Sequence, residues 1–315
     1  MNALVRRVGG SVGSFNAESR VLGFGRTVIA LAQATVFLFT PASHLFVPVG
    51  GDEVEIQCDS AVRSVTAYCL LDGTDRQIVS WIVLAILLVV ASGLLPRYTS
   101  VLHAWAALSI HTSFSLPDGG ETVAQVCTLF LVLACANDRR TWHWQAPRAE
   151  RSHRGSAFQG IAWAGHWGLR LQVAYIYLNS ALAKLSVGQW QDGTATYYVS
   201  RMETFGASGV LADPVLWFTA LPVVALATTW GTIAAEVAIA VLVLVSGRKQ
   251  LVALALSVCL HLVIVVQIGI VSFGFVMVGV IVCATARSLE PELSRAAAAR
   301  RAAPNAVAAV RGPRG

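Results

Sequence analysis

Long apolar stretches, separated by short polar ones, constrain this chain more than any other feature of its sequence. Several of them reach or approach the roughly 20 residues that an α-helix needs to cross the hydrocarbon core of a bilayer. Charged residues make up 13% of the 315 residues, whereas a soluble domain carries about 25%. The sequence therefore predicts an all-α fold, a polytopic transmembrane helical bundle in contact with the lipid bilayer.

We expect eight spans, joined by short loops. Their approximate ranges are 27–47, 78–95, 99–116, 122–136, 162–185, 222–246, 251–269 and 271–286. Pro41 is expected to kink the first span, which membrane helices tolerate. The apolar stretch 214–246 is long enough for one generous span or two short ones, and we expect one crossing after a membrane-dipping piece at 214–221. A single crossing keeps the basic residues at 247–249 on the same side as the basic C-terminal tail.

Charge predicts the domain organisation and the side of each loop, because basic residues avoid translocated loops. Residues 1–25 are expected to form a cytoplasmic N-terminal segment, residues 26–286 the transmembrane domain, and residues 287–315 a basic, disordered cytoplasmic tail. The arginine-rich loop 137–160 is expected inside and the acidic loop 48–78 outside. The net charge of +6 is explained by these loops, and the sequence contains no module typical of nucleic-acid binding.

Two cysteines lie in the loop that is expected outside, Cys58 and Cys69. An oxidising compartment would allow them to pair, but sequence spacing does not fix the geometry that a disulfide needs. A disulfide and two unpaired thiols therefore both remain open. The cysteines and histidines of the chain lack zinc-type spacing, and we predict no metal site.

Lys184 stands out because only it and Lys249 are lysines among 23 basic residues. It ends the fifth expected span, close to the outer interface, and His111 belongs to the same outer layer. A lysine can lose its proton, whereas an arginine cannot, so Lys184 is a candidate catalytic residue and His111 a candidate functional residue beside it. The alternative is that Lys184 snorkels to the interface and that His111 is an ordinary polar helix end.

A second group of polar residues is expected near the middle of the membrane. Counting about 1.5 Å per residue places Arg170, Glu236 and His261 at depths where they could meet. Unpaired charges in hydrocarbon are expensive, so Glu236 is expected to pair with Arg170 or His261. The alternatives are a purely structural ion pair and an ordinary core histidine.

Aromatic and small residues surround Lys184 in the sequence. Tyr177 lies seven residues before Lys184 and therefore on the same helix face, and Trp190 and Gly193 follow shortly after it. These three residues are candidates for the rim of a site. A tyrosine at this helical spacing, such as Tyr177, is more often a packing residue than a chemical one, and Trp190 fits an interfacial aromatic belt as well as the rim of a site.

The run from Tyr175 to Leu185, followed by Trp190 and Gly193, resembles the HTTM family, the horizontally transferred transmembrane domain. The resemblance covers roughly residues 20–286. It extends distantly to the vitamin K-dependent gamma-carboxylases, and the compact all-membrane build resembles the sporulation-delaying, SdpB-like members more closely. The carboxylases carry a second lysine where this chain has Ala183, and they carry a large luminal domain that this chain lacks.

The resemblance implies a multi-pass protein of a bacterial plasma membrane. It would work with a small partner protein in the maturation or export of a secreted antimicrobial peptide, made from a peptide precursor. One alternative implied by the carboxylases is a quinone-coupled oxidoreductase or carboxylase with Lys184 as the base and His111 assisting. The other alternative is a non-catalytic receptor or immunity-type membrane protein. The sequence leaves open whether the protein is an enzyme and what its cofactor would be.

Overall fold

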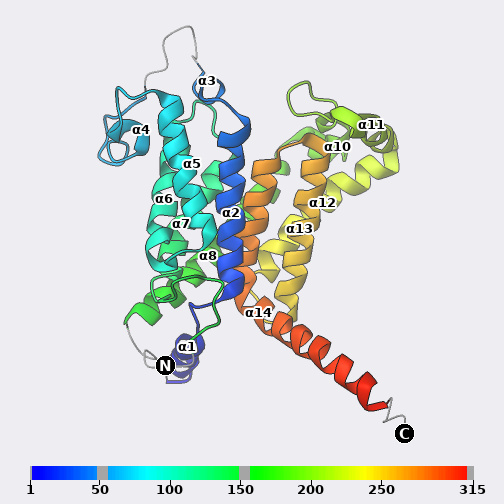
Figure 1. Cartoon of the computed structure of the whole chain (residues 1–315). Coiled ribbons are helices and arrows are strands. Elements are labelled where there is room, and N and C mark those ends of the chain that lie inside the picture. The colour runs from blue at the N-terminus through cyan, green and yellow to red at the C-terminus, as the bar shows by residue number, and fades with distance from the viewer. Residues whose placement is uncertain (1, 48–55, 149–156, 311–315) are drawn as a thin grey trace.

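The chain folds into an all-α helical membrane bundle (Figure 1). The computed structural model describes residues 2–47, 56–148 and 157–310, and these ranges contain helices and no strand. Each expected span overlaps one long helix. These helices are α2 (Arg20–Phe39), α5 (Arg76–Ser92), α6 (Pro96–Ser113), α7 (Gly119–Ala134), α8 (Ala157–Lys184), α12 (Pro222–Leu242), α13 (Arg248–Ile268) and α14 (Val271–Val310).

Shorter helices cover the two ends of this bundle. They are α1 (Asn2–Ser14), α3 (Ala42–Leu45), α4 (Ala67–Leu70), α9 (Gly188–Gln191), α10 (Ala195–Val199), the 3-10 helix η1 (Gly209–Leu211) and α11 (Ala212–Ala220). In Figure 1, α1 lies near one end of the bundle, and α3, α4, α10 and α11 lie at the opposite end. We call these the terminal end and the loop end.

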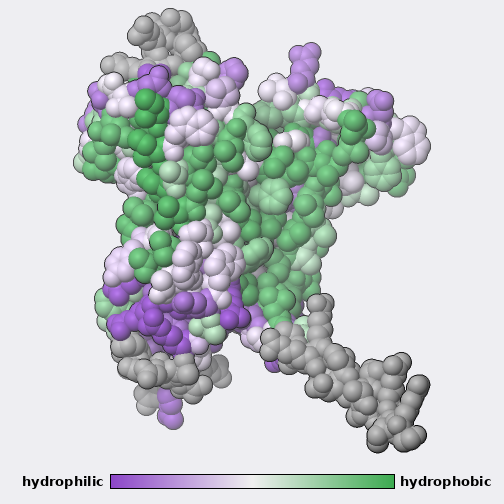
Figure 2. All heavy atoms as spheres, viewed as in Figure 1, coloured by the Kyte–Doolittle hydropathy of each residue, from purple (hydrophilic) through white to green (hydrophobic). Residues whose placement is uncertain are grey.

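The surface of the bundle supports its assignment to the membrane. By length and apolar composition, α2, α12, α13 and Val271–Ala296 are each sufficient to cross a membrane, and α5 and α7 are shorter apolar helices. Figure 2 shows a broad hydrophobic band between hydrophilic residues at the terminal end and at the loop end. This distribution is the one that a bilayer requires, since only apolar side chains can face the hydrocarbon core.

The first expected span differs from the structure at both of its ends. The helix begins earlier, at Arg20, because the Ser19 hydroxyl caps it and accepts a hydrogen bond from the Leu22 amide at 3.1 Å. It ends at Phe39, and Pro41 then precedes the separate short helix α3. The expected kink at Pro41 is therefore a break, because proline disfavours a helical conformation in the residue before it.

Small residues hold the first and last long helices together. An added Cβ at Gly25 in α2 would lie 2.6 Å from the Cys283 sulfur in α14, and one at Gly279 would lie 2.8 Å from the Gly25 carbonyl oxygen. Both glycines thus allow a close approach of two helices from opposite ends of the sequence. Such contacts are typical of helix packing in membranes, where small residues let backbones come close.

The C-terminal part of the chain contains one agreement and one difference. Residues 214–246 form part of α11 and then α12, which passes once through the bundle as expected. In contrast, α14 continues as a helix to Val310 and extends away from the bundle (Figure 1). The expected disorder after residue 287 is therefore not what the structure has, and the many alanines of this segment have the highest helix propensity.

Candidate functional site

Helix α8 brings three polar side chains to one face near the loop end. Tyr177, Ser180 and Lys184 are spaced by three and four residues, which places them one above another on a helix. Tyr177 is 2% exposed, while Ser180 and Lys184 are partly buried. Their partners come from α12, which packs against α8, and from α13, which packs against α12.

Lys184 forms an ion pair with Glu236 of α12. The Lys184 ammonium donates to both carboxylate oxygens, at 2.7 and 3.0 Å, and lies 2.6 Å from the Ser180 hydroxyl oxygen. The Ser180 hydroxyl donates to the same carboxylate at 3.0 Å. These three residues, which we call the α8 cluster, form a closed triangle. The carboxylate side chain is 6% exposed and that of the lysine 20%, so the triangle opens toward the surface at the lysine.

The expected pairing of Glu236 with Arg170 or His261 is wrong. Residue depth alone placed Glu236 far below Lys184, but side chains of a helix lean toward its N-terminus. Helices α8 and α12 run in opposite directions, so Lys184 leans toward the terminal end and Glu236 toward the loop end. The two long side chains thereby meet between their backbones.

A second polar group lies directly beside the α8 cluster. The Tyr177 hydroxyl is 2.7 Å from the Ser257 hydroxyl oxygen and 2.9 Å from His261 Nε2, and both partners lie on α13. His261 is 3% exposed, its ring packs against Phe273 with a centroid distance of 5.3 Å, and its Nδ1 has no hydrogen-bond partner among the residues that the structure describes. The structure thus joins Tyr177 to His261, whereas the sequence listed Tyr177 with the rim of the Lys184 site and His261 with the mid-membrane group.

Arg170 has a different role from the one expected. Its Nε donates to the Val243 carbonyl at 3.0 Å, and one terminal nitrogen donates to the Val245 carbonyl at 3.3 Å. The guanidinium also lies 3.9 Å from the centre of the Trp167 ring. It forms no ion pair with any residue in the described part of the chain. Arg170 therefore binds carbonyls at the end of α12, which α-helices leave without internal partners.

His111 lies apart from Lys184 in its contacts. Its Nδ1 is 3.5 Å from the Thr122 hydroxyl on α7, and no hydrogen bond joins it to Lys184 within the described residues. Of the expected rim residues, Trp190 has a contact with the α8 cluster, while Gly193 contacts another residue of α12. The Lys184 ammonium is 5.2 Å from the centre of the Trp190 ring, and Gly193 has a positive φ of 82° and closely approaches Leu226.

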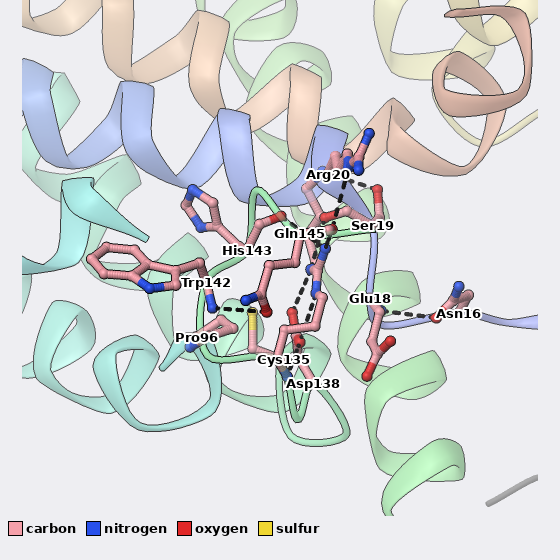
Figure 3. A network of polar contacts seen from close by, with 12 residues as sticks. Asn16, Glu18, Ser19, Arg20, Pro96, Cys135, Asp138, Trp142, His143 and Gln145 are labelled. Carbon is pink, nitrogen blue, oxygen red and sulfur yellow. Dashed lines mark hydrogen bonds and ion pairs between the residues drawn. The ribbon is translucent and has the colours of Figure 1, made fainter. Parts of the chain in front are cut away.

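The sequence did not predict the polar network at the terminal end, shown in Figure 3. Asp138 and Arg140 form an ion pair at 2.6 Å, with side chains 2% and 1% exposed. Arg140 also donates to the carbonyls of His143 at 2.8 Å and Ser19 at 3.2 Å. In the sequence, Asp138 stands directly before two arginines. This pattern predicts on which side of the membrane the loop lies, and it does not predict a buried ion pair.

Arg26 is a second buried arginine that the sequence did not indicate. It is 1% exposed and donates to the Pro96 carbonyl at 2.9 Å and the Thr99 hydroxyl at 2.6 Å. These bonds join α2 to α6.

At the loop end, Cys58 and Cys69 are joined by a disulfide with a Cα–Cα distance of 5.7 Å. The sequence left open whether these two cysteines pair, and in the structure they do.

Comparisons with known proteins give two relatives from Bacillus subtilis strain 168. The chain is 30% identical over 276 residues to the uncharacterized protein YitO, and the match covers 85% of each chain. It is 26% identical over 278 residues to the sporulation-delaying protein SdpB, covering 87% of this chain and 83% of SdpB. No family model and no solved structure matches the chain. The predicted SdpB-like relation is thus supported, while the resemblance to the HTTM domain and to the gamma-carboxylases stays a prediction.

Proposed function

The chain belongs to the family of YitO and the sporulation-delaying protein SdpB, and from this membership we propose that it acts in the maturation or export of a secreted antimicrobial peptide. It would do so in the bacterial plasma membrane, together with a small partner protein. Both similarities extend over more than four fifths of each chain. The relation therefore concerns the whole bundle rather than one module of it.

The observation that carries this proposal is the α8 cluster. Lys184, Ser180 and Glu236 place a cation, a hydroxyl and a carboxylate together inside the membrane bundle. Charged groups inside the membrane are costly and are therefore functional by default. The lysine side of the cluster is partly exposed, and Leu182 and Leu185 beside it are exposed apolar residues.

This arrangement suits a peptide chain in a membrane. Amide and carbonyl groups of a peptide need hydrogen-bond partners where water is absent. Lys184 and Ser180 can donate to peptide carbonyls, and Glu236 can accept from peptide amides. The three groups can exchange their mutual hydrogen bonds for bonds to a peptide, so that no polar atom is left unpaired during the exchange.

The ion pair also bears on the role of Lys184 as a base. An ammonium donates to Glu236 and has no lone pair with which to take a proton. A quinone-coupled reaction with Lys184 as base would first require transfer of its proton to Glu236. The geometry therefore supports a protonated Lys184 that binds and orients a substrate over a free amine that deprotonates a quinone.

The test uses a strain from which the gene is deleted, complemented with the wild-type chain or with single variants. Secreted peptides whose presence in the medium depends on the gene are identified by mass spectrometry. Lys184→Met and Glu236→Gln should lower the amount of mature peptide by about tenfold or more, because each leaves a polar partner unpaired. Lys249→Met, which changes the only other lysine, should leave it unchanged.

The outcomes separate the three functions. The proposal is wrong if no secreted peptide depends on the gene, or if Lys184→Met releases the full amount at matched membrane levels of protein. A full amount with Lys184→Arg would show that a permanent cation suffices, which excludes Lys184 as a base. Loss with Lys184→Arg would indicate that the proton of the lysine, or its compact shape, is required.

A further inference from the structure

A cavity of about 630 Å³ lies at the terminal end, away from the α8 cluster. Three separate parts of the chain line it most extensively, namely residues 14–22, residues 146–147 and residues 286–294, and His166 of α8 also contributes. Helix α14 borders the cavity where it emerges from the bundle. The cavity therefore lies beside the first turn of α2, at the terminal end of the bundle, where Figure 2 shows hydrophilic residues below the hydrophobic band.

Two arginines in the lining have no acidic partner. Arg20 donates from Nε to the Gln145 carbonyl at 3.2 Å. Arg287 donates to the hydroxyl oxygens of Ser11 at 3.1 Å and Ser14 at 2.8 Å. Neither guanidinium forms an ion pair with any of the residues that the structure describes. Both are exposed, and each retains N–H groups that can bind an anion.

A buried histidine adds a further polar group. His166 lines the cavity and is 3% exposed, and its Nε2 has no hydrogen-bond partner within the described part of the chain. Its ring packs against Phe15, another lining residue, with a centroid distance of 5.3 Å. Buried polar atoms without a partner are rare in folded proteins and call for an explanation. His166 therefore places a polar ring in the wall of the cavity, with its Nε2 enclosed by protein atoms.

Glu290 is the acidic residue of the lining, and it is already engaged. Its Oε1 accepts a hydrogen bond from the backbone amide of Arg20 at 3.1 Å, at the first turn of α2. One carboxylate against two guanidinium groups leaves a formal excess of one positive charge in the lining. Phe15 and Leu22 provide apolar surface beside it. The cavity is thus suited to a ligand with an anionic group and an apolar part.

We propose that this cavity binds a phosphate group, carried by an anionic phospholipid headgroup or present as a free phosphate ion. Arginine forms its strongest hydrogen bonds with phosphate and carboxylate oxygens. Basic pockets between membrane helices bind anionic lipid headgroups by the same chemistry. The cavity lies at the terminal end beside the starts and ends of membrane helices, and the two sources of phosphate to be distinguished are a lipid headgroup and a free ion.

The test uses the full chain reconstituted in nanodiscs. Three conditions are compared, namely phosphatidylcholine alone, phosphatidylcholine with phosphatidylglycerol, and phosphatidylcholine alone with added inorganic phosphate at constant ionic strength. Binding is read from the thermal unfolding midpoint, which rises when a ligand binds the folded state, and from the lipid that co-purifies with the protein. The double variant Arg20→Gln/Arg287→Gln should bind about tenfold or more weakly than the wild type.

Two further variants guard the interpretation. Arg248→Gln removes an exposed arginine at the start of α13 that does not line the cavity, and its binding should match that of the wild type. The single variant Arg20→Gln loses one hydrogen bond to a carbonyl and serves if the double variant does not fold. Its folding is checked by helical content in phosphatidylcholine alone.

Each outcome decides the proposal. If the unfolding midpoint rises with phosphatidylglycerol but not with inorganic phosphate, the site binds a lipid headgroup. If inorganic phosphate raises the midpoint by a similar amount, the site binds a free anion. The proposal is overturned if neither probe raises the midpoint. It is also overturned if the folded double variant, or a folded Arg20→Gln variant where the double variant does not fold, responds as the wild type does, or if Arg248→Gln weakens binding to the same extent.

Discussion

Lys184 and Glu236 join α8 to α12 through an ion pair of 2.7 Å, which the Ser180 hydroxyl completes. Lysine and carboxylate come from antiparallel helices, so that each side chain leans toward the other. Neither charge has to remain unpaired within the bundle. The pair consequently fixes the register of α8 against α12 at the level where the candidate site opens.

Removing one partner of this pair should destabilise the protein strongly. Lys184→Met leaves the nearly buried Glu236 carboxylate without its cation and should lower the free energy of unfolding by about 3 kcal/mol, the lower part of the range for buried pairs, since the lysine is partly exposed. The double variant Lys184→Met/Glu236→Leu should recover most of that loss, because it removes both charges. The free energy of unfolding is measured for Lys184→Met, Glu236→Leu and the double variant by reversible unfolding in detergent micelles. If the effects of the two single changes simply add up in the double variant, the pairing is excluded.

Arg170 should behave independently of Glu236. Its hydrogen bonds run to the carbonyls of Val243 and Val245, and the Glu236 carboxylate is taken by Lys184. Arg170→Gln and Glu236→Gln should therefore be additive within about 0.5 kcal/mol. Arg170→Lys should still lower the free energy of unfolding by about 1–2 kcal/mol, because an ammonium cannot both bind two carbonyls and stack on Trp167. A coupling energy between Arg170 and Glu236 well above that limit would contradict the structure.

These residues show how far the sequence reaches. The apolar runs predict the long helices, because the membrane imposes both their length and their composition. Counting residues from helix ends gives depth but not the direction of a side chain or the neighbour of a helix face. The sequence therefore identified Lys184, Glu236 and Arg170 as important polar residues and assigned Glu236 the wrong partner. Hydrogen bonds to backbone carbonyls, such as the one from Arg26 to Pro96, leave no pattern in a sequence.

Gly23 should be intolerant of a side chain. It lies in α2 against the loop that follows α7, and an added Cβ would be 2.6 Å from His143 Cγ. His143 is fully buried and cannot move away without displacing the loop. Gly23→Ala should lower the free energy of unfolding by about 1–3 kcal/mol through overpacking.

Gly231→Ala is the matched control for this change. It is also a glycine within a membrane helix, but an added Cβ there would meet no atom within 4 Å. This substitution should be neutral or stabilising by up to about 1 kcal/mol, since alanine has the higher helix propensity. Equal effects at the two glycines, measured by thermal unfolding, would contradict the close contact at His143.

His143 should make the protein sensitive to acid. Burial, followed by the charges of Arg26 and Arg140, lowers the pKa of His143 from 6.5 to about 3 in the folded state. The unfolded chain therefore takes up a proton more readily, and stability is unaffected above about pH 6.5. As the pH falls from there toward 3, the contribution of this residue should decline by roughly 1.4 kcal/mol for each pH unit.

The variant His143→Gln isolates this contribution. It removes the titrating ring and keeps a polar side chain near the Thr27 hydroxyl, which lies 3.3 Å from His143 Nε2 in the structure. The free energy of unfolding is measured between pH 7.5 and 5 for both proteins. The wild type should show the steeper decline, and parallel curves would show that His143 does not resist protonation in the folded state.

The disulfide between Cys58 and Cys69 allows the orientation of the bundle to be measured. Both cysteines lie in the segment before α5, at the loop end. Disulfides persist in oxidising compartments, and the acidic residues of this segment also favour the outside. In intact cells a membrane-impermeant maleimide should therefore label the protein only after an impermeant reductant has been added.

Other cysteines limit what this labelling can report, and each can be controlled. Cys127, Cys135 and Cys283 are buried, whereas Cys259 is exposed on α13, so the experiment is done with Cys259→Ala. Labelling should disappear in Cys58→Ser/Cys69→Ser, because these two thiols are the ones released by reduction. Arg248→Cys, introduced at the terminal end, should react only after the cells are permeabilised. Labelling of the loop cysteines without reductant would contradict the disulfide, and labelling of both ends from outside would contradict the expected orientation.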